Sequence, residues 1–208
     1  MTNVLCFGDS NTWGYDPATG ARYSLDVRWP GVLRRELGDG WHVIEDALNG
    51  RTTAFDDPVK PGRRGLDFLP VAMESHSPLD WVVLMLGTND VKKHFNANPL
   101  VIARGMELLV GVVRRWEPEA RILLMAPPPF GVITEFAEIF EGSAVKLAPL
   151  AERYREFSER LGCEFFNTGE VVRSSDVDGV HWEAAEHEKL GRAVAAILRR
   201  GTATPKPR

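Results

Sequence analysis

Three side chains at the two ends of the chain could together perform acyl transfer by a serine nucleophile. Ser10 follows the apolar run Val4–Phe7, and Gly8 between them permits a sharp turn at the end of a strand. Asp178 and His181 stand three residues apart near the other terminus. A neutral hydroxyl is a weak nucleophile, so it needs a base and a group that orients the base. We therefore predict that one loop delivers Asp178 and His181 to Ser10.

Acyl transfer also needs hydrogen-bond donors for the developing oxyanion. The sequence offers one such donor after each of the first three predicted strands. They are the backbone N–H of Ser10, a backbone N–H in the segment around Gly50, and the side-chain amide of Asn89. The carboxyl ends of parallel strands meet at one edge of a sheet, where open α/β folds bind their ligands. The three donors are expected to converge there.

Two alternatives remain open from the residues alone. Ser10 could cap a helix or contact a phosphate, because Gly-Asp-Ser-Asn-Thr after a first strand also suits an anion-binding loop. Asp176 competes with Asp178, since both precede His181 on one segment.

The remaining ionisable residues of interest are given structural roles. Asp9 is expected to shape the turn at the nucleophile, and Asp90 to hold a loop by accepting backbone N–H bonds. His94 is close enough to Asn89 in sequence to reach the pocket. No helical zinc-binding spacing is present, so no metal is predicted. The other histidines, expected at the surface or in structural positions, are His42, His76 and His187.

Five apolar segments recur between helical patterns, which predicts an α/β fold with a parallel five-stranded sheet in a three-layer α/β/α arrangement. The segment Trp81–Leu86 is apolar on both faces and is expected at the middle of the sheet. The five predicted strands are Val4–Phe7, His42–Ile44, Trp81–Leu86, Arg121–Met125 and Glu164–Phe166.

Three helices are specified by their end signals and apolar periodicity. One begins at Asn98, which can cap it, with Pro99 at the first position. A second could begin at Ser143 and end at Gly162, although Pro149 disturbs its first turns, and the last runs over 184–200. Two long connections, 14–26 and 127–142, are expected to bind something or to contact a partner, and 127–142 could line the pocket or a subunit interface.

Composition excludes several classes of function. The 208 residues carry a net charge of −4 with acids and bases interspersed, so neither nucleic-acid nor membrane binding is predicted. No leader or long apolar run is recognisable, which favours a cytoplasmic protein, and Cys6 and Cys163 are expected to be reduced. We predict one domain over 1–200 and a disordered tail over 201–208.

Four blocks in order along the chain resemble the signature blocks of the SGNH, or GDSL-type, hydrolases. In this resemblance Ser10, Gly50, Asn89 and His181 are the four name-giving residues, and Asp178 takes the position of the triad acid. Together they imply the SGNH hydrolase fold, a flavodoxin-like parallel five-stranded sheet. The blocks are Gly8-Asp9-Ser10, Gly50 within Asn-Gly-Arg-Thr-Thr, Gly87-Thr88-Asn89-Asp90 and Asp178-Gly179-Val180-His181.

Longer stretches are similar to the arylesterase and acyltransferase branch of that family. They are residues 8–14, Asp26-Val27-Arg28-Trp29, Asn49-Gly50-Arg51-Thr52-Thr53 with Asp56-Asp57-Pro58 following, residues 86–92, and Pro127-Pro128-Pro129. The likeness implies a serine esterase for small, short-acyl aryl or alkyl esters, able to pass the acyl group to alcohols or peroxide. It also implies no cofactor and a homo-oligomer. Asn11 departs from the family, which expects leucine there, and we place it at the pocket. The residues expected to form the substrate pocket are Asn11, Trp13, Tyr15, Lys92, Phe95 and Trp182.

Three rival functions are weighed against the esterase. A carbohydrate O-deacetylase would use the same triad with a more open groove. A flavodoxin-like flavin-binding module would use the first loop to hold a flavin phosphate. An interaction protein with an inactive site is the least favoured, because every catalytic part is present.

Overall fold

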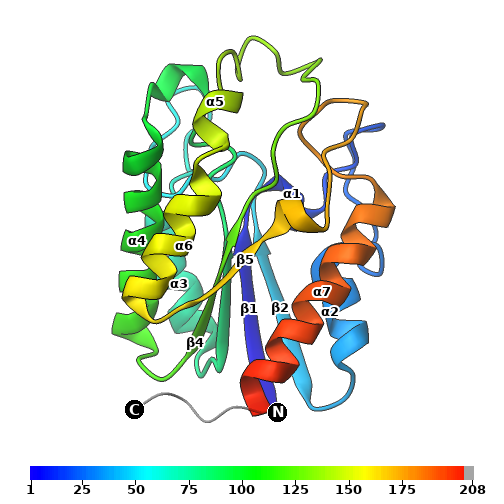
Figure 1. Ribbon diagram of the computed structural model, residues 1–208. Coiled ribbons are helices and arrows are strands. Elements are labelled where there is room, and N and C mark those ends of the chain that lie inside the picture. The colour runs from blue at the N-terminus through cyan, green and yellow to red at the C-terminus, as the bar shows by residue number, and fades with distance from the viewer. Residues whose placement is uncertain (204–208) are drawn as a thin grey trace.

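The sheet is parallel throughout and has the strand order β2-β1-β3-β4-β5 (Figure 1). The computed structural model describes residues 1–203. The predicted five-stranded α/β fold is confirmed. The strands are β1 (Thr2–Gly8), β2 (Trp41–Ala47), β3 (Trp81–Met85), β4 (Arg121–Ala126) and β5 (Glu164–Asn167).

Strand β3 occupies the middle of the sheet, as its composition predicts. All five of its residues are buried, and it pairs with β1 from Val4 opposite Trp81 to Gly8 opposite Met85. Its Trp-Val-Val-Leu-Met sequence suits this place, because a strand covered on both faces needs apolar side chains at every position.

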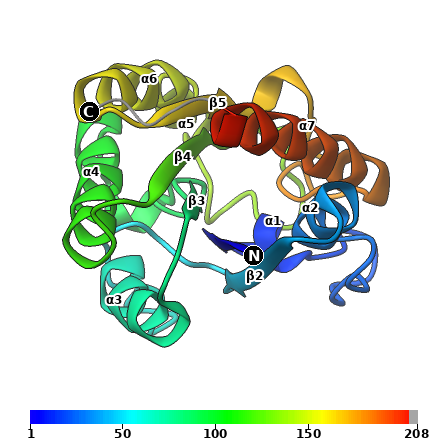
Figure 2. The same cartoon turned by 90° about the horizontal axis from the view of Figure 1, so that it is seen from below.

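Helices cover both faces of the sheet, so the molecule has three layers (Figure 2). On one face, α2 (Trp29–Leu37) lies beside α7 (Ala184–Ala203) over a core that includes Trp29, Trp81 and Trp182. On the other face, α3 (Gly65–His76), α4 (Pro99–Trp116) and α6 (Leu150–Leu161) cover a larger apolar cluster. The shorter helices are α1 (Ser10–Trp13), α5 (Ala144–Leu147) and the 3₁₀ turns Lys93–Phe95 and Thr168–Glu170.

Helix α4 begins as predicted, with the Asn98 side chain accepting the Val101 N–H at 3.0 Å and Pro99 at the first position. The helix predicted from Ser143 to Gly162 begins after Ser143 as expected, but it is two helices instead of one. Pro149 divides it into α5 and α6, and the Ser143 hydroxyl donates to the Val91 carbonyl instead of capping. Gly162 ends α6 in the left-handed region, as expected.

The predicted boundary of the tail is also wrong, because α7 continues through residues 201–203. Gly201 is buried, and a Cβ there would lie 2.5 Å from the Trp81 ring. The helix predicted to end at residue 200 therefore continues, and Gly201 lets it approach the sheet closely. Residues 204–208, the rest of the predicted tail, lie outside the described residues.

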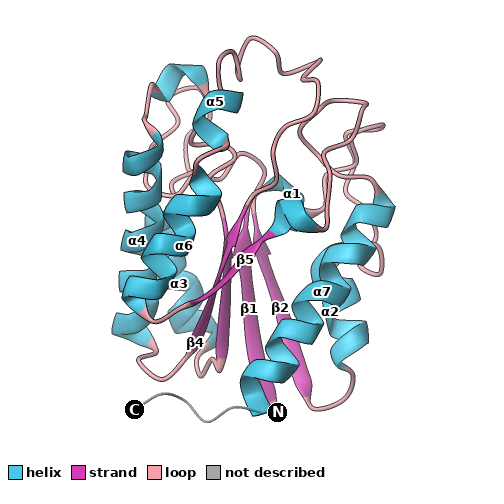
Figure 3. Ribbon diagram, in the orientation of Figure 1, coloured by secondary structure: helices cyan, strands magenta, loops and turns pink. Residues whose placement is uncertain are grey.

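The connections that follow the carboxyl ends of the strands lie together at one end of the sheet (Figure 3). Strands β2 and β3 are the two neighbours of β1, on its opposite sides. After β2 the strand order therefore runs the other way, from β3 to β5, and the point of reversal lies between β1 and β3. Open α/β sheets bind ligands at this switch point. Within residues 1–203, no helix has the length and apolar character needed to cross a membrane.

Candidate active site

Ser10 is presented by a one-turn helix that starts directly above β1. The Asp9 carboxylate caps this turn by accepting the Asn11 N–H at 3.0 Å, and Gly14 ends it with a positive φ of 86°. Gly8 is required beneath it, because a Cβ would lie 2.1 Å from the Thr12 hydroxyl. Asp9 therefore shapes the turn, as predicted.

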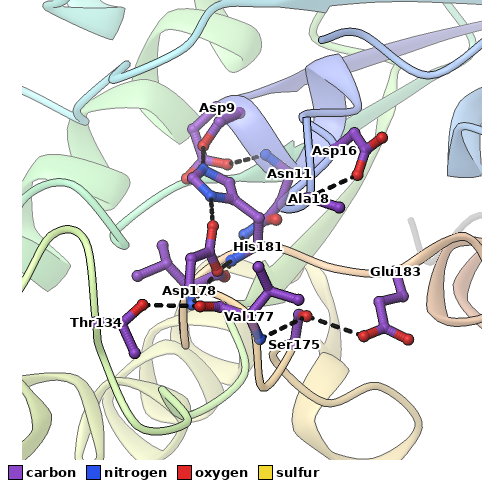
Figure 4. A network of polar contacts seen from close by, with 12 residues as sticks. Asp9, Asn11, Asp16, Ala18, Thr134, Ser175, Val177, Asp178, His181 and Glu183 are labelled. Carbon is purple, nitrogen blue, oxygen red and sulfur yellow. Dashed lines mark hydrogen bonds and ion pairs between the residues drawn. The ribbon is translucent and has the colours of Figure 1, made fainter. Parts of the chain in front are cut away.

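The structure brings Ser10, His181 and Asp178 into one hydrogen-bonded chain. Figure 4 shows the contact between His181 and Asp178. His181 Nε2 lies 2.9 Å from Ser10 Oγ, and His181 Nδ1 lies 2.6 Å from Asp178 Oδ2. All three side chains are nearly buried. This is the arrangement in which an imidazole can take a proton from a hydroxyl while a carboxylate stabilises the imidazolium.

The Asp178 carboxylate is held by three donors from its own loop. Its Oδ1 accepts the N–H groups of Val180 at 2.8 Å and His181 at 2.9 Å, and its Oδ2 faces the His181 ring. Burial raises the pKa of Asp178, but these hydrogen bonds outweigh burial and hold the pKa below its ordinary value. Asp176 is exposed, so the geometry favours Asp178 as the partner of His181.

The loop 127–142 supports the histidine loop from outside. The Thr134 hydroxyl donates to the Val177 carbonyl at 2.8 Å, and the Gly131 N–H donates to the Gly179 carbonyl at 2.9 Å (Figure 4 shows the first of these contacts). The Phe136 ring meets the His181 ring edge-on, with centroids 5.7 Å apart. Thus one function of this long connection is to hold the histidine loop.

Three candidate N–H donors for an oxyanion belong to residues that line one cavity. In the described chain, the backbone N–H groups of Ser10 and Gly50 have no protein acceptor. The Asn89 amide gives one hydrogen to the Arg51 carbonyl at 3.1 Å and keeps the other. Ser10, Gly50 and Asn89 all line the same cavity, which is the arrangement an oxyanion hole needs.

Gly50 and Asn89 are held in place by buried polar contacts. Gly50 sits in a turn with a φ of 82°, which favours glycine. The Arg51 guanidinium binds the Gly8 carbonyl at 3.2 Å and the Asp46 carboxylate at 2.8 Å, which ties this turn to the end of β1. The loop after β2 and the nucleophile therefore share one frame.

Asp90, next to Asn89, joins the two loops of the proposed oxyanion hole. Its carboxylate accepts both the backbone N–H and the hydroxyl of Thr53, as the loop-holding role predicts. Burial, partly opposed by the Thr53 hydrogen bonds, raises the pKa of Asp90 to about 7. Burial also raises the pKa of Asp9 to about 6.

These raised values predict a specific pH dependence of stability. A carboxylate that titrates at about 7 when folded, against 3.8 unfolded, binds its proton more tightly in the folded state, so it destabilises the fold as pH rises through that window. Asp90→Asn removes this titration and keeps an acceptor for Thr53. We expect the free energy of unfolding of Asp90→Asn, relative to wild type, to increase from pH 4 to pH 7 in urea titrations.

The exposed Asp39→Asn variant measures the effect of removing a carboxylate alone. A relative stability of Asp90→Asn that stays constant across the window, or that falls with pH, would contradict the raised pKa of Asp90.

The cavity above Ser10 has a volume of about 300 Å³. Two of the predicted pocket residues, Tyr15 and Lys92, line it. The Tyr15 ring lies over His181, with centroids 4.1 Å apart and planes inclined by 32°. Phe136, Ile139 and Phe140 contribute apolar surface, so the loop 127–142 forms part of the cavity wall.

The other four predicted pocket residues do not line this cavity. Asn11 is buried and donates to the Val180 carbonyl at 3.4 Å, which joins α1 to the histidine loop. The Trp13 ring lies against the Arg22 guanidinium. Phe95 packs on Phe55, and Trp182 is fully buried in the core beneath α7. The direction of each of these side chains is set by the group it packs against or hydrogen-bonds, and not by its closeness in sequence to a catalytic residue.

Sequence reasoning missed the part of the cavity wall that comes from the connection between β2 and α3, where Asp57, Val59 and Lys60 line the cavity. His94, expected to reach the pocket, lines the same cavity. The only signal was the Asp56-Asp57-Pro58 stretch, which belongs to the resemblance but carries no periodic pattern. Asp57 forms an ion pair with Lys92, which lies 35 residues later in the sequence. No local sequence pattern predicts such a pairing.

His187 has a structural role. It is fully buried, and its Nδ1 accepts the Trp29 N–H at 3.4 Å. Burial lowers the pKa of His187 to about 3. No group of three or more His, Cys, Asp or Glu residues within 1–203 is arranged to hold a metal ion.

Comparison with known proteins agrees with the geometry. The model of the GDSL-like lipase/acylhydrolase family matches residues 6–189. No curated protein sequence matched the chain.

Two solved structures of similar sequence cover almost all of the chain. A carbohydrate acetylesterase from Sinorhizobium meliloti is 38% identical with a TM-score of 0.93, and the alignment covers 96% of this chain and 99% of that one. The aryl esterase of M. smegmatis is 40% identical with a TM-score of 0.92 and the same coverage. With its fold and four signature blocks, the chain belongs to the GDSL-like lipase/acylhydrolase family and is a carboxylic ester hydrolase.

Proposed function

We propose that the protein is a serine esterase that cleaves small, short-acyl aryl or alkyl esters through an acyl-enzyme. One observation carries this proposal. Hydrogen bonds connect Asp178 through His181 to Ser10, and Ser10 and His181 line a small, largely apolar cavity. Three residues with available N–H donors line the same cavity.

The reaction follows from the contacts. Ser10 Oγ attacks the ester carbonyl while His181 Nε2 accepts the hydroxyl proton, and Asp178 stabilises the imidazolium. The tetrahedral intermediate expels the alcohol, which takes the proton from His181. Water, activated by the same nitrogen, then cleaves the acyl-enzyme and releases the acid and free Ser10.

The negative charge that forms on the carbonyl oxygen would be met by the N–H groups of Ser10, Gly50 and Asn89. These donors are fixed before the substrate arrives, because the Arg51 and Asp90 contacts hold their loops. Donors that need no reorganisation are most effective in a site that excludes water.

Asn89→Ala is expected to lower kcat by about 10²–10³-fold, or about 2.7–4 kcal/mol, with a much smaller change in KM. The amide would be needed chiefly when the oxygen becomes charged, so its loss affects the transition state more than substrate binding. Steady-state kinetics with p-nitrophenyl acetate measure both constants. An unchanged kcat with a raised KM would mean that Asn89 binds substrate and does not stabilise the oxyanion.

The size of the cavity supports short acyl groups. Its volume of about 300 Å³ lies at the lower end of ordinary ligand pockets, and Tyr15, Phe136 and Phe140 occupy its walls. We expect kcat/KM for p-nitrophenyl acetate to exceed that for p-nitrophenyl octanoate. The reverse order would favour a lipase or thioesterase.

A carbohydrate O-deacetylase is the second candidate. It is supported by the similar acetylesterase from S. meliloti and by the polar wall that Asp57, Lys60 and Lys92 give the cavity. Acetylated sugars and phenyl acetate compared at equal concentration distinguish the two substrates.

Acyl transfer to alcohols or peroxide would use the same acyl-enzyme. The exposed side chains of Val59 and Ile139 give the cavity mouth an apolar part, which favours an organic acceptor over water. Formation of benzyl acetate from ethyl acetate and benzyl alcohol in water tests this activity.

A further inference from the structure

The cavity contains a group of charged side chains that the reaction above does not use. Lys92 Nζ donates to Asp57 Oδ2 at 3.1 Å, and His94 Nε2 lies 3.4 Å from Asp57 Oδ1. Lys60 lies on the same wall, and all four residues line the cavity. Asp57 and Lys92 are almost completely buried, with 2% and 10% of their side chains exposed. Burying an ion pair is costly, so this one calls for an explanation.

Lys92 keeps unused donor capacity inside the cavity. An ammonium group has three N–H donors, and the described residues supply Lys92 with one acceptor, the Asp57 carboxylate. The other two are available to a molecule that fills the cavity. An occupant with oxygen acceptors would satisfy them.

Positive charge exceeds negative charge at this end of the site. Burial raises the pKa of Asp57, but the hydrogen bond and charge of Lys92, together with the Val59 N–H, outweigh it and hold the pKa below its usual value, so the carboxylate carries one negative charge. Against it stand Lys92, Lys60 and Arg63. Burial lowers the pKa of Lys60, and repulsion from Arg63 and Lys92 adds to that effect.

The additional cations lie beside a proposed oxyanion donor. A Cβ on Gly50 would lie 3.5 Å from Lys60 Cδ and 3.7 Å from Arg63 Nε. Arg63 Nε donates to the Asn49 carbonyl at 2.8 Å, which fixes it there. On the Tyr15 side of the cavity the neighbouring charges are those of Glu135 and Asp178, so the field across the site runs from positive to negative.

We propose that the end of the cavity formed by Lys60 and Lys92 binds a carboxylate that the ester substrate carries, so that the preferred substrates are anionic esters. This inference rests on the proposed esterase function and names the substrate class for the same site. A carboxylate would accept the free N–H groups of Lys92 and balance the excess positive charge. The carboxylate could belong to the acyl part, as in a dicarboxylic acid monoester, or to the alcohol part, as in an acylated hydroxy acid.

Two matched pairs of esters test the proposal and distinguish these sources. Phenyl hydrogen glutarate and phenyl 4-carbamoylbutanoate differ only in a carboxylate or an amide on the acyl side. 4-Acetoxybenzoate and 4-acetoxybenzamide differ in the same way on the leaving group. We expect kcat/KM to favour the anion in one pair, by about tenfold for a charge-assisted hydrogen bond. Preference for the amide, or no preference, in both pairs would overturn the proposal.

Lys92→Gln should remove this preference, and Lys93→Gln is the matched control. Lys93 is the next residue in sequence, has 62% of its side chain exposed and pairs with Glu141 outside the cavity. The ratio of anion to amide should fall in Lys92→Gln and stay at the wild-type value in Lys93→Gln. If Lys92→Gln does not fold, the exposed Lys60→Gln variant must lower the same ratio. A ratio that neither variant changes would contradict the assignment.

Hydrolysis of phenyl acetate separates this proposal from the esterase proposal. If wild type hydrolyses phenyl acetate and shows no preference for anions, only the anion site is refuted. If wild type hydrolyses none of the five esters, the esterase function itself fails.

Discussion

Ser10→Ala is expected to abolish esterase activity while the fold persists. The substitution removes the attacking oxygen, and comparable losses of a serine nucleophile lower kcat by at least about 10⁴-fold. It removes one side-chain hydrogen bond, to His181 Nε2 at 2.9 Å, so the melting temperature should change little. Hydrolysis of p-nitrophenyl acetate by the two proteins measures the loss.

Two controls make this result specific to the nucleophile. Ser24→Ala removes an exposed hydroxyl from the loop before α2 and should retain wild-type activity. A sulfonyl fluoride should add one label per wild-type chain and none per Ser10→Ala chain, as read by intact-protein mass spectrometry. If Ser10→Ala retained most of the activity, attack by another group would explain the hydrolysis and the proposed mechanism would fail.

The sequence predicts the strands and the catalytic loops well, because both depend on local patterns. The buried run in β3 marks the middle of the sheet, and Gly8 and Gly50 mark turns whose geometry requires or favours glycine. Parallel strands then bring their carboxyl ends together, which places residues 171 positions apart in sequence beside one another. Ser10 and His181 meet for this reason.

The pocket is harder to predict, because the direction of a side chain depends on tertiary packing. Trp182 follows His181 in sequence but turns into the core beneath α7, while Tyr15 lies over the His181 ring. Asp57 and Lys92 form their ion pair between two irregular loops, where no hydrophobic period operates. The same limit explains Gly201, whose role depends on the Trp81 ring of β3, far away in sequence, on the face of the sheet that α7 covers.

Asp90 shows how the fold links its structure to the proposed chemistry. Its bonds to Thr53 join the loop that carries Gly50 to the loop that carries Asn89. Two donors from different strands must keep a fixed separation to stabilise one oxygen, and a buried carboxylate between their loops provides that constraint. Burying the charged carboxylate costs free energy, and the raised pKa of Asp90 reflects that cost.

Asp178→Asn is expected to lower kcat by about 10⁴-fold, although the two side chains have the same shape. Asp178 Oδ1 accepts the Val180 and His181 backbone N–H groups, and an asparagine must keep its carbonyl oxygen there to satisfy them. Its amide NH₂ then faces His181 Nδ1, where the carboxylate now lies 2.6 Å away. The ring would be forced to carry its proton on Nε2, so it could no longer accept the proton of Ser10.

Asp176→Asn is the matched control, because Asp176 lies two residues away on the same loop and is exposed. It should retain wild-type kcat. The ¹⁵N chemical shifts of the His181 ring distinguish the two tautomers and should show Nδ1 protonated in wild type and Nε2 protonated in Asp178→Asn. If Asp176→Asn lost as much activity as Asp178→Asn, or if the His181 tautomer did not change, the loop would act through its conformation and Asp178 would not be the group that orients the base.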